Sequence, residues 1–274
     1  MYCTQCGQYL AGGVRFCTHC GARVYPPVAA AAEPAPPRER TPWGYADMAM
    51  AIGVVIGALI LLVVPLIIIV GIVADGEIED DDDAVTAVVI GAGFLLEGFL
   101  LLAAALFSVA KYNLSWATLG LRPPRRGGFW FPLPLFFAAL AVFISYVAVV
   151  TVIGWEVEGN VAEETFDSTV PIVLLGILSL GLAPFMEEVF FRGFLFGGLR
   201  GRLGVLGAAL ASGLLFAFAH FQDLSTLPLL PVIGIIGMLF AWAYYYTGSL
   251  FAPIVAHLFF NLVSFTFGVL GVTT

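Results

Sequence analysis

Charged side chains are scarce in this sequence. Only 11% of its 274 residues are Asp, Glu, Lys or Arg, while 61% are hydrophobic. Soluble domains carry about 25% charged residues and are about half apolar, so the composition excludes an ordinary soluble domain. It predicts an all-α polytopic membrane protein whose surroundings are the lipid bilayer. The few basic residues do not form a basic tail, and we therefore expect no nucleic-acid partner.

Cysteine is absent after residue 20. The four cysteines form two Cys-x2-Cys pairs separated by ten residues, Cys3 with Cys6 and Cys17 with Cys20. This spacing predicts a structural Zn²⁺ held by four thiolates in a zinc ribbon over residues 1–25. A disulfide pair or a redox dithiol is the alternative, but a redox motif is seldom doubled, and so short a segment cannot fold without a metal. Such a ribbon offers a contact for a protein partner or for a substrate.

A linker and a series of apolar segments follow the ribbon. Residues 26–42 are rich in Pro and Ala, which is typical of an extended linker. Beyond it we predict about seven transmembrane helices, divided between an N-terminal region at 43–169 and a core at 170–270. Their expected ranges are 45–74, 84–110, 129–154, 170–199, 204–222, 228–247 and 250–270. Pro184 is expected to kink the fourth helix.

Lysine and arginine are missing from every second loop. With the N-terminus in the cytoplasm, all eleven basic residues fall on cytoplasmic segments or in the inner part of the fourth helix. The opposite loops carry acids instead, at 75–83 and 156–167. The positive-inside rule therefore predicts a multi-pass protein of the cell membrane with a cytoplasmic N-terminus and an external C-terminus. The opening MYCTQCGQYL lacks the basic start and apolar core of a secretory signal, and a reducing compartment suits the thiolates.

Three charges interrupt the fourth apolar segment in the run EEVFFRG. Each ionisable group costs about 2.5–3.5 kcal/mol at the centre of a bilayer, so such groups usually mark function. Glu188 and Arg192 are four residues apart, the spacing at which a carboxylate and a guanidinium pair on one helix face. Glu187 points about 100° away and lacks that partner. An unpaired carboxylate near a histidine is what general-base activation of water requires.

Two further polar pairs lie in the apolar segments downstream. Phe216 and His220 are four residues apart, as are His257 and Asn261. The imidazole and the amide of the second pair share one helix face and can donate hydrogen bonds to a developing oxyanion. Together with the EEVFFRG run, these residues predict one buried site built from three helices.

Other protease motifs are absent. The chain has no HExxH sequence, and the LASG segment around Ser212 lacks the spacing of a membrane serine protease. Glu97 lies in another apolar segment outside any motif, and the sequence assigns it no role. The alternative to an enzyme is a membrane scaffold or immunity protein whose polar residues serve packing alone.

The runs EEVFFRG, FAFAH and HLFFN resemble the three signatures of the CPBP intramembrane proteases, which comprise CAAX prenyl endopeptidases and bacteriocin-processing or self-immunity proteins. The context TGSLFAPIVAHLFFN and the segment LGLRPP also fit that family. The resemblance implies that Glu187 activates water with His220 beside it, and that His257 and Asn261 form the oxyanion site. Glu188, Arg192 and Phe216 would organise the pocket.

The expected function is therefore an intramembrane endopeptidase that cleaves a membrane-associated or prenylated protein or peptide. The resemblance implies a glutamate-dependent reaction, but a carboxylate with two histidines is also a Zn²⁺ ligand set, so the sequence leaves a metal at this site open. A non-catalytic scaffold or a bacteriocin self-immunity protein of the same fold is the alternative.

Overall fold

The computed structural model describes residues 2–11, 14–23, 40–66, 68–69, 82–155, 169–221 and 224–270, with the backbone alone at 82–85. The predicted linker up to residue 39 and most of both acidic loops lie outside these residues. The chain divides into two compact units, residues 1–39 and 40–274. The first contains the cysteines, and the second contains every element of the predicted membrane region.

Every regular element that the structure describes in the second unit is a helix. Its α-helices are α1 (Tyr45–Ala58), α3 (Asp82–Ala104), α4 (Pro132–Val152), α5 (Thr169–Gly176), α6 (Ala183–Glu187), α7 (Gly197–Ala219), α8 (Leu230–Thr247) and α9 (Phe251–Val269). π-Helical stretches occur at η1 (Leu59–Val63), η2 (Ala105–Ala110), η5 (Ile177–Leu182) and η6 (Glu188–Phe196), and 3₁₀ turns at η3 (Trp116–Leu119) and η7 (Leu227–Leu229).

Six continuous helical stretches in the described residues are long and apolar enough to cross a membrane. The fourth runs from Thr169 to Ala219 over 51 residues, which is too long for one crossing. Gly204 within it has φ 75° and ψ 175°, a conformation that ends a helix and that glycine adopts readily. This break divides the stretch into two helices, and the seven that result agree with the predicted number.

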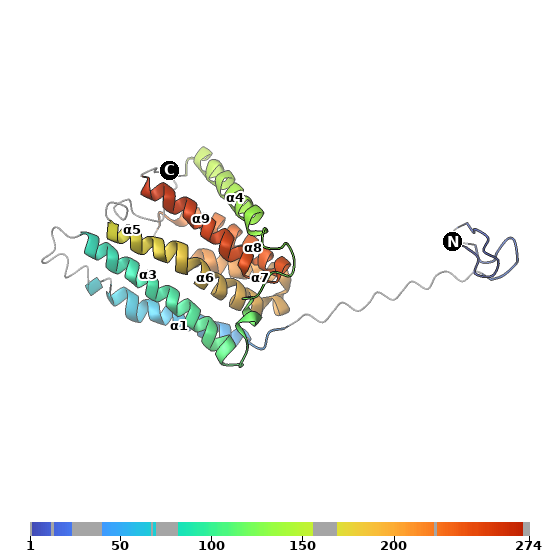
Figure 1. Ribbon diagram of the computed structural model, residues 1–274, viewed down its shortest axis with the longest axis horizontal. Helices are drawn as coiled ribbons and strands as arrows, with labels where there is room; N and C mark the ends of the chain where they lie inside the picture. The colour runs from blue at the N-terminus through green and yellow to red at the C-terminus, as the bar shows by residue number, and fades with distance from the viewer. Residues whose placement is uncertain are drawn as a thin grey trace. The chain divides into compact units, whose positions relative to one another are not determined.

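The helices pack as neighbours across the bundle. Figure 1 shows α1, α3, α5 and α9 following one another, with α4 beyond α9, and α1, α3 and α5 are in direct contact in that order. Helix α7 packs along α8. Side chains on the outer surface are large and apolar: Leu61 is 73% exposed and Val152 is 85% exposed. Such a surface suits contact with lipid, and the chain is a multi-pass membrane protein.

The segment with the EEVFFRG run lies at the centre of the bundle. All nine residues of η6 are buried. Pro184 stands at the start of α6, directly after the π-helical η5. Because proline lacks an N–H and crowds the preceding turn, the wider winding before it relieves that crowding. The segment therefore reaches the core as an irregular helix that its neighbours enclose.

Glycine allows α8 to approach this centre. A Cβ atom on Gly237 would lie 3.1 Å from the ring of Phe216 and 3.2 Å from Nη2 of Arg192. On α7, a Cβ atom on Gly213 would lie 2.7 Å from the carbonyl oxygen of Gly234. The two helices thus meet backbone to backbone next to Arg192, as small residues permit in membrane helices.

Hydrogen bonds of Trp43 and Asp47 fix the start of α1. The indole of Trp43, which is fully buried, donates a hydrogen bond from Nε1 to the carbonyl oxygen of Phe194 at 3.0 Å. Asp47 accepts hydrogen bonds from Lys111 Nζ at 2.6 Å and from the Tyr112 hydroxyl at 2.9 Å. These contacts tie the start of α1 to η6 and to the residues that follow η2.

Candidate active site

The ion pair expected from the i,i+4 spacing forms in the structure. Arg192 Nη1 donates to Glu188 Oε1 at 2.8 Å, and both side chains are fully buried. Arg192 Nη2 also donates to the carbonyl oxygen of Gly237 at 3.3 Å, and the guanidinium carbon lies 4.1 Å from the centre of the Phe216 ring. A buried charge is tolerated only where it is paired and hydrogen-bonded. Glu188, the Gly237 carbonyl and an aromatic face supply that compensation.

His257 connects α9 to both glutamates. Its Nδ1 lies 3.1 Å from Glu188 Oε1, so the imidazole N–H donates to the carboxylate, which can only accept. This bond directs Nε2 toward Glu187 Oε2, at 3.7 Å. That distance exceeds a hydrogen bond. The rings of Phe216 and Phe240 flank the imidazole, with centroids 5.9 Å and 5.7 Å away.

Glu187 is buried yet incompletely satisfied. Its residue surface is 9% exposed, and its Oε2 atom has no hydrogen-bond partner within the described residues. Its carboxyl group interacts with that of Glu97 on α3, a helix that packs against α6. Sequence reasoning misses Glu97, because the residue belongs to no motif and the interaction joins helices that are distant in the chain. Its position in an apolar segment was the one available signal.

His220 adjoins this group through an aromatic ring. It ends α7, and its Nδ1 lies 2.9 Å from the carbonyl oxygen of Phe216, so Nδ1–H donates to that oxygen. Its ring centroid is 4.6 Å from that of Phe216. Among the described contacts, none joins His220 directly to Glu187, and the histidine beside Glu187 is His257. Phe216 contacts both imidazoles and is the link between them.

Asn261 lies one turn after His257 on α9. Its Nδ2 donates to the carbonyl oxygen of Ser179 at 2.9 Å, which ties α9 to η5. The amide has a second N–H on the same nitrogen. The structure thus brings Glu187, Glu188, Arg192, Phe216 and His257 into direct contact, and places His220 and Asn261 next to that group.

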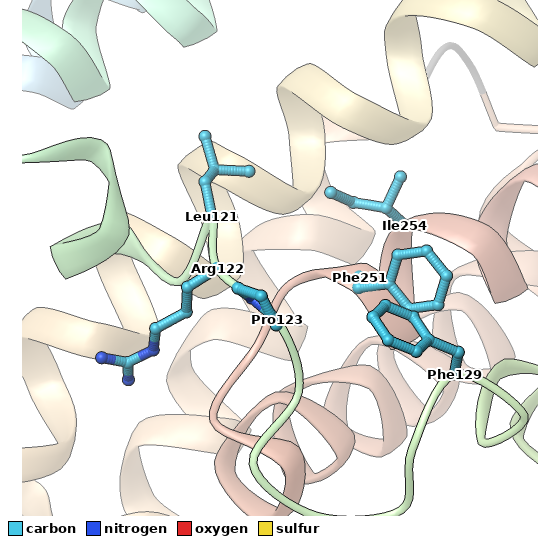
Figure 2. Close-up of a pocket in the computed structure, with 6 residues that line it drawn as sticks. All are labelled: Leu121, Arg122, Pro123, Phe129, Phe251 and Ile254. Atoms are coloured by element: carbon cyan, nitrogen blue, oxygen red, sulfur yellow. The ribbon is translucent and has the colours of Figure 1, made fainter.

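An apolar cavity opens beside this part of α9. It encloses about 310 Å³ and lies between the segment after η3 and the start of α9, as Figure 2 shows. Its lining residues are Leu121, Arg122, Pro123, Phe129, Phe251 and Ile254. Ile254 precedes His257 by three residues, about 4.5 Å along a helix. The LGLRPP segment supplies one wall, so it contributes to the surroundings of the site.

The four cysteines of the first unit converge. Cys3 Sγ is 3.7 Å from Cys20 Sγ, Cys6 Sγ is 3.7 Å from Cys17 Sγ, and all four sulfur atoms lie within 4.8 Å of one another. Ligands about 2.3 Å from a tetrahedral Zn²⁺ lie about 3.8 Å apart, so the four thiolates fit a structural metal.

Backbone N–H groups lower the pKa of the Cys3 and Cys17 thiols and so favour their thiolate forms. The N–H groups of Cys6 and Gln5 lower the pKa of the Cys3 thiol from 9.0 to about 6. Gly7 donates its N–H to the Cys3 carbonyl with φ at 73°, and Gly21 repeats this turn after Cys17 with φ at 72°. Within the described residues, the cysteines are the one group of Cys, His, Asp and Glu close enough together for a metal. Glu187, His220 and His257 do not form such a group.

Comparison with known proteins supports both parts of the chain. Residues 169–263 match the family of type II CAAX prenyl endopeptidases, Rce1-like, and residues 2–24 match the zinc-ribbon domain. A relative, "Putative membrane peptidase YdiL" from Bacillus subtilis (strain 168), is 34% identical over 131 residues, which are 48% of this chain and 50% of that protein. No solved structure matches. The chain thus contains a segment similar to the Rce1-like CAAX endopeptidases and an N-terminal segment similar to a zinc ribbon.

The buried ion pair yields a stability prediction. Replacing Arg192 by Met leaves Glu188 charged and uncompensated, and we expect a loss of about 3–5 kcal/mol in the free energy of unfolding. The double variant Glu188→Met/Arg192→Met should lose less than Arg192→Met alone. Denaturation of the purified protein in mixed micelles measures both.

Lys111→Met serves as the matched control. It also removes one cation from an ion pair, but the Lys111 side chain is 45% exposed, and the buried Asp47 keeps its hydrogen bonds from the Tyr112 hydroxyl and the Gly44 N–H. Its loss should therefore be smaller than that of Arg192→Met. Equal stability of Arg192→Met and Lys111→Met would contradict a central role for the buried pair.

Proposed function

We propose that the segment similar to CAAX endopeptidases is the catalytic core of an intramembrane endopeptidase, which hydrolyses a peptide bond of a membrane-associated protein or peptide. The observation that carries this proposal is the buried group of Glu187, Glu188, Arg192 and His257. In that group Glu188 is paired with Arg192, whereas Glu187 has no arginine or lysine partner and lies 3.7 Å from His257 Nε2. A purely structural cluster has no need for the second carboxylate.

Glu187 is the general base. Its Oε2 and the Nε2 of His257 are 3.7 Å apart, so both can contact one reacting molecule lying beside them. In the reaction the carboxylate takes a proton from water, the water oxygen attacks the scissile carbonyl carbon, and the C–N bond breaks as the proton passes to the leaving nitrogen. His220 assists from the other side of Phe216, because its Nδ1–H is bonded to a carbonyl and its Nε2 remains an acceptor.

His257 and Asn261 stabilise the oxyanion. Glu188 holds the Nδ1–H of His257, and the imidazolium form presents an Nε2–H toward the reacting carbonyl. Asn261 donates one amide N–H to the carbonyl oxygen of Ser179, and its second N–H donates to the oxyanion of the substrate. Arg192 and Phe216 fix these groups through Glu188 and through ring contacts.

The substrate that the site suits best carries an apolar group. The cavity of about 310 Å³ next to Ile254 is at the lower end of the size range of small-molecule pockets, and its lining is apolar except for Arg122. A prenylated or otherwise membrane-embedded peptide can place an apolar chain there while its peptide bond lies near His257. A protein with a prenylated CAAX end is one such substrate.

One observation favours a second candidate function, that of a non-catalytic scaffold or a self-immunity protein. Asn261 and Glu188 both make contacts that hold helices together, with the Ser179 carbonyl oxygen and with His257. A protein that used the whole group in this way would be insensitive to an isosteric change at Glu187.

Glu187→Gln tests the enzyme against the scaffold. We expect the variant to lose cleavage by about 10²–10⁴-fold, because the amide cannot accept the proton from water. The first assay measures cleavage of a farnesylated peptide that ends in a CAAX sequence, in lipid vesicles. The second compares, by mass spectrometry, the cleavage products of membrane proteins in cells that contain the wild type or the variant. Ser264→Ala, an exposed change on α9, is the control. Identical products from wild type and Glu187→Gln would end the assignment.

The charges at one end of the bundle support a cytoplasmic N-terminus and an external C-terminus. Arg122 Nε donates to the carbonyl oxygen of Gly248, Arg200 lies over the ring of Tyr244, and Arg202 over that of Tyr45. These contacts join the start of α1, the end of α8 and the turn at Gly204 at one membrane face. We assign this basic face to the cytoplasm.

Cysteine labelling tests this orientation. In a chain whose ribbon cysteines are replaced by serine, Leu270→Cys should react with a membrane-impermeant maleimide on intact cells. Trp130→Cys, in the exposed segment before α4, should react only after lysis. The reverse pattern would refute the assigned orientation.

The ribbon metal is Zn²⁺, held by Cys3, Cys6, Cys17 and Cys20, and its role is to fold the first unit. We expect one zinc per chain by elemental analysis of the purified protein. Cys17→Ser should abolish that zinc, while His19→Ala should keep it. Retention of a full equivalent in Cys17→Ser would contradict the four-thiolate site. The ribbon then remains a candidate contact for a protein partner or for the substrate.

A further inference from the structure

Two buried carboxyl groups meet at the boundary between α3 and α6. Glu97 and Glu187 are each only 9% exposed, the helices that carry them are packed together, and their carboxyl groups interact with each other. Oε2 of Glu97 and Oε2 of Glu187 both lack a hydrogen-bond donor within the described residues. The interaction is therefore unsatisfied as long as both groups are carboxylates.

One proton shared by the two carboxyl groups supplies a hydrogen-bond donor and removes one of the two like charges. Two carboxylates can only accept hydrogen bonds, and like charges in contact in an apolar interior repel each other strongly. If one group is a carboxylic acid, its O–H donates to the other, and the pair carries one negative charge.

The surroundings decide which group keeps the proton. The titratable or charged groups on the elements packed against α3 are Glu187 of α6, Glu188 and Arg192 of η6, and Tyr45 and Asp47 of α1. Asp47 is bonded to Lys111 and Tyr112. Across the site, the titratable side chain within reach of Glu187 is His257.

The positive groups favour charge on Glu187. Arg192 interacts with Glu187 electrostatically, and His257 Nε2 lies 3.7 Å from its carboxylate. Of the groups just named, Glu187 is the one that interacts with Glu97. The charge is therefore more stable on Glu187, and the proton on Glu97.

We propose that Glu97 is a positioning residue of the site: as a neutral carboxylic acid it donates a hydrogen bond to Glu187, and so keeps that carboxylate ionised and directed toward His257. The role rests on the proposed function, because it acts through the general base. Arg192 balances Glu188, and the Glu97–Glu187 pair, with one proton, places a single negative charge beside His257.

Infrared spectroscopy tests the proton directly and needs no substrate. For the purified protein in phosphatidylcholine vesicles near neutral pH, we expect a carbonyl stretching band of a protonated carboxyl group. Glu97→Gln should remove this band. Glu187→Gln should keep the band but shift it, because the acceptor changes from a carboxylate to an amide.

Three results would overturn the proposal: no such band in the wild type, a band that survives Glu97→Gln, or a band that is lost in Glu187→Gln. If Glu97→Gln does not accumulate in membranes, Glu187→Gln decides alone. A wild-type band that Glu187→Gln leaves unshifted then overturns the contact.

A pH profile of cleavage separates a positioning role from a structural one. With the farnesylated peptide as probe, Glu97→Leu should move the acid limb of kcat/KM to higher pH by about one unit, a tenfold change in the proton affinity of the base. Glu97→Gln retains a donor and should keep the limb near its wild-type position. Leu95→Ala, an exposed change on the same helix, is the control.

If the acid limb does not move in Glu97→Leu, or moves equally in Glu97→Gln, Glu97 has a structural role only and does not position Glu187. Failure of the wild type to cleave the probe would count against the proposed substrate, while the infrared result would still decide the state of Glu97.

Discussion

The structure depends on the burial of one guanidinium in the middle of a membrane protein. Arg192 is fully enclosed, and its charge forces three contacts: with Glu188, with the carbonyl of Gly237 on α8, and with the face of Phe216 on α7. Glu188 in turn holds His257 on α9. Because an unpaired charge in this interior is very unfavourable, these contacts cannot loosen independently. Compensation of one charge thus fixes the relative positions of the helices that carry the candidate catalytic groups.

The winding of the central segment fits this arrangement. A π-helical turn widens the helix, and such turns often occur at functional sites. Here it begins at Glu188, directly after Glu187. The two neighbouring glutamates therefore leave the helix in different surroundings: one is enclosed with Arg192, and the other faces α3 and His257. Similar side chains acquire different chemistry from their environment, as buried carboxyl pairs do in general.

Much of the fold could be predicted from the sequence, and less of the site. The length of the apolar segments predicts the helices, and the distribution of the basic residues predicts their orientation, because the bilayer imposes both rules. The Glu188–Arg192 pair followed from spacing within one helix. Contacts between helices cannot be predicted in this way, because counting residues along a helix gives the depth of a side chain in the membrane but not its direction around the helix axis. For that reason neither the closeness of His257 to Glu187 nor the interaction of Glu187 with Glu97 can be predicted from the sequence.

The mutual compensation of Arg192, Glu188 and His257 also bears on how such a protein can evolve. Each of these residues constrains the other two, so substitutions there would have to arise together, through intermediates that fold poorly. Glu187 is under no such constraint from the ion pair. A lineage that gave up catalysis but kept the membrane fold would therefore first exchange Glu187 and retain its neighbours. Glu188 and Arg192 are therefore expected to persist wherever the fold persists, and Glu187 only where the proposed activity does.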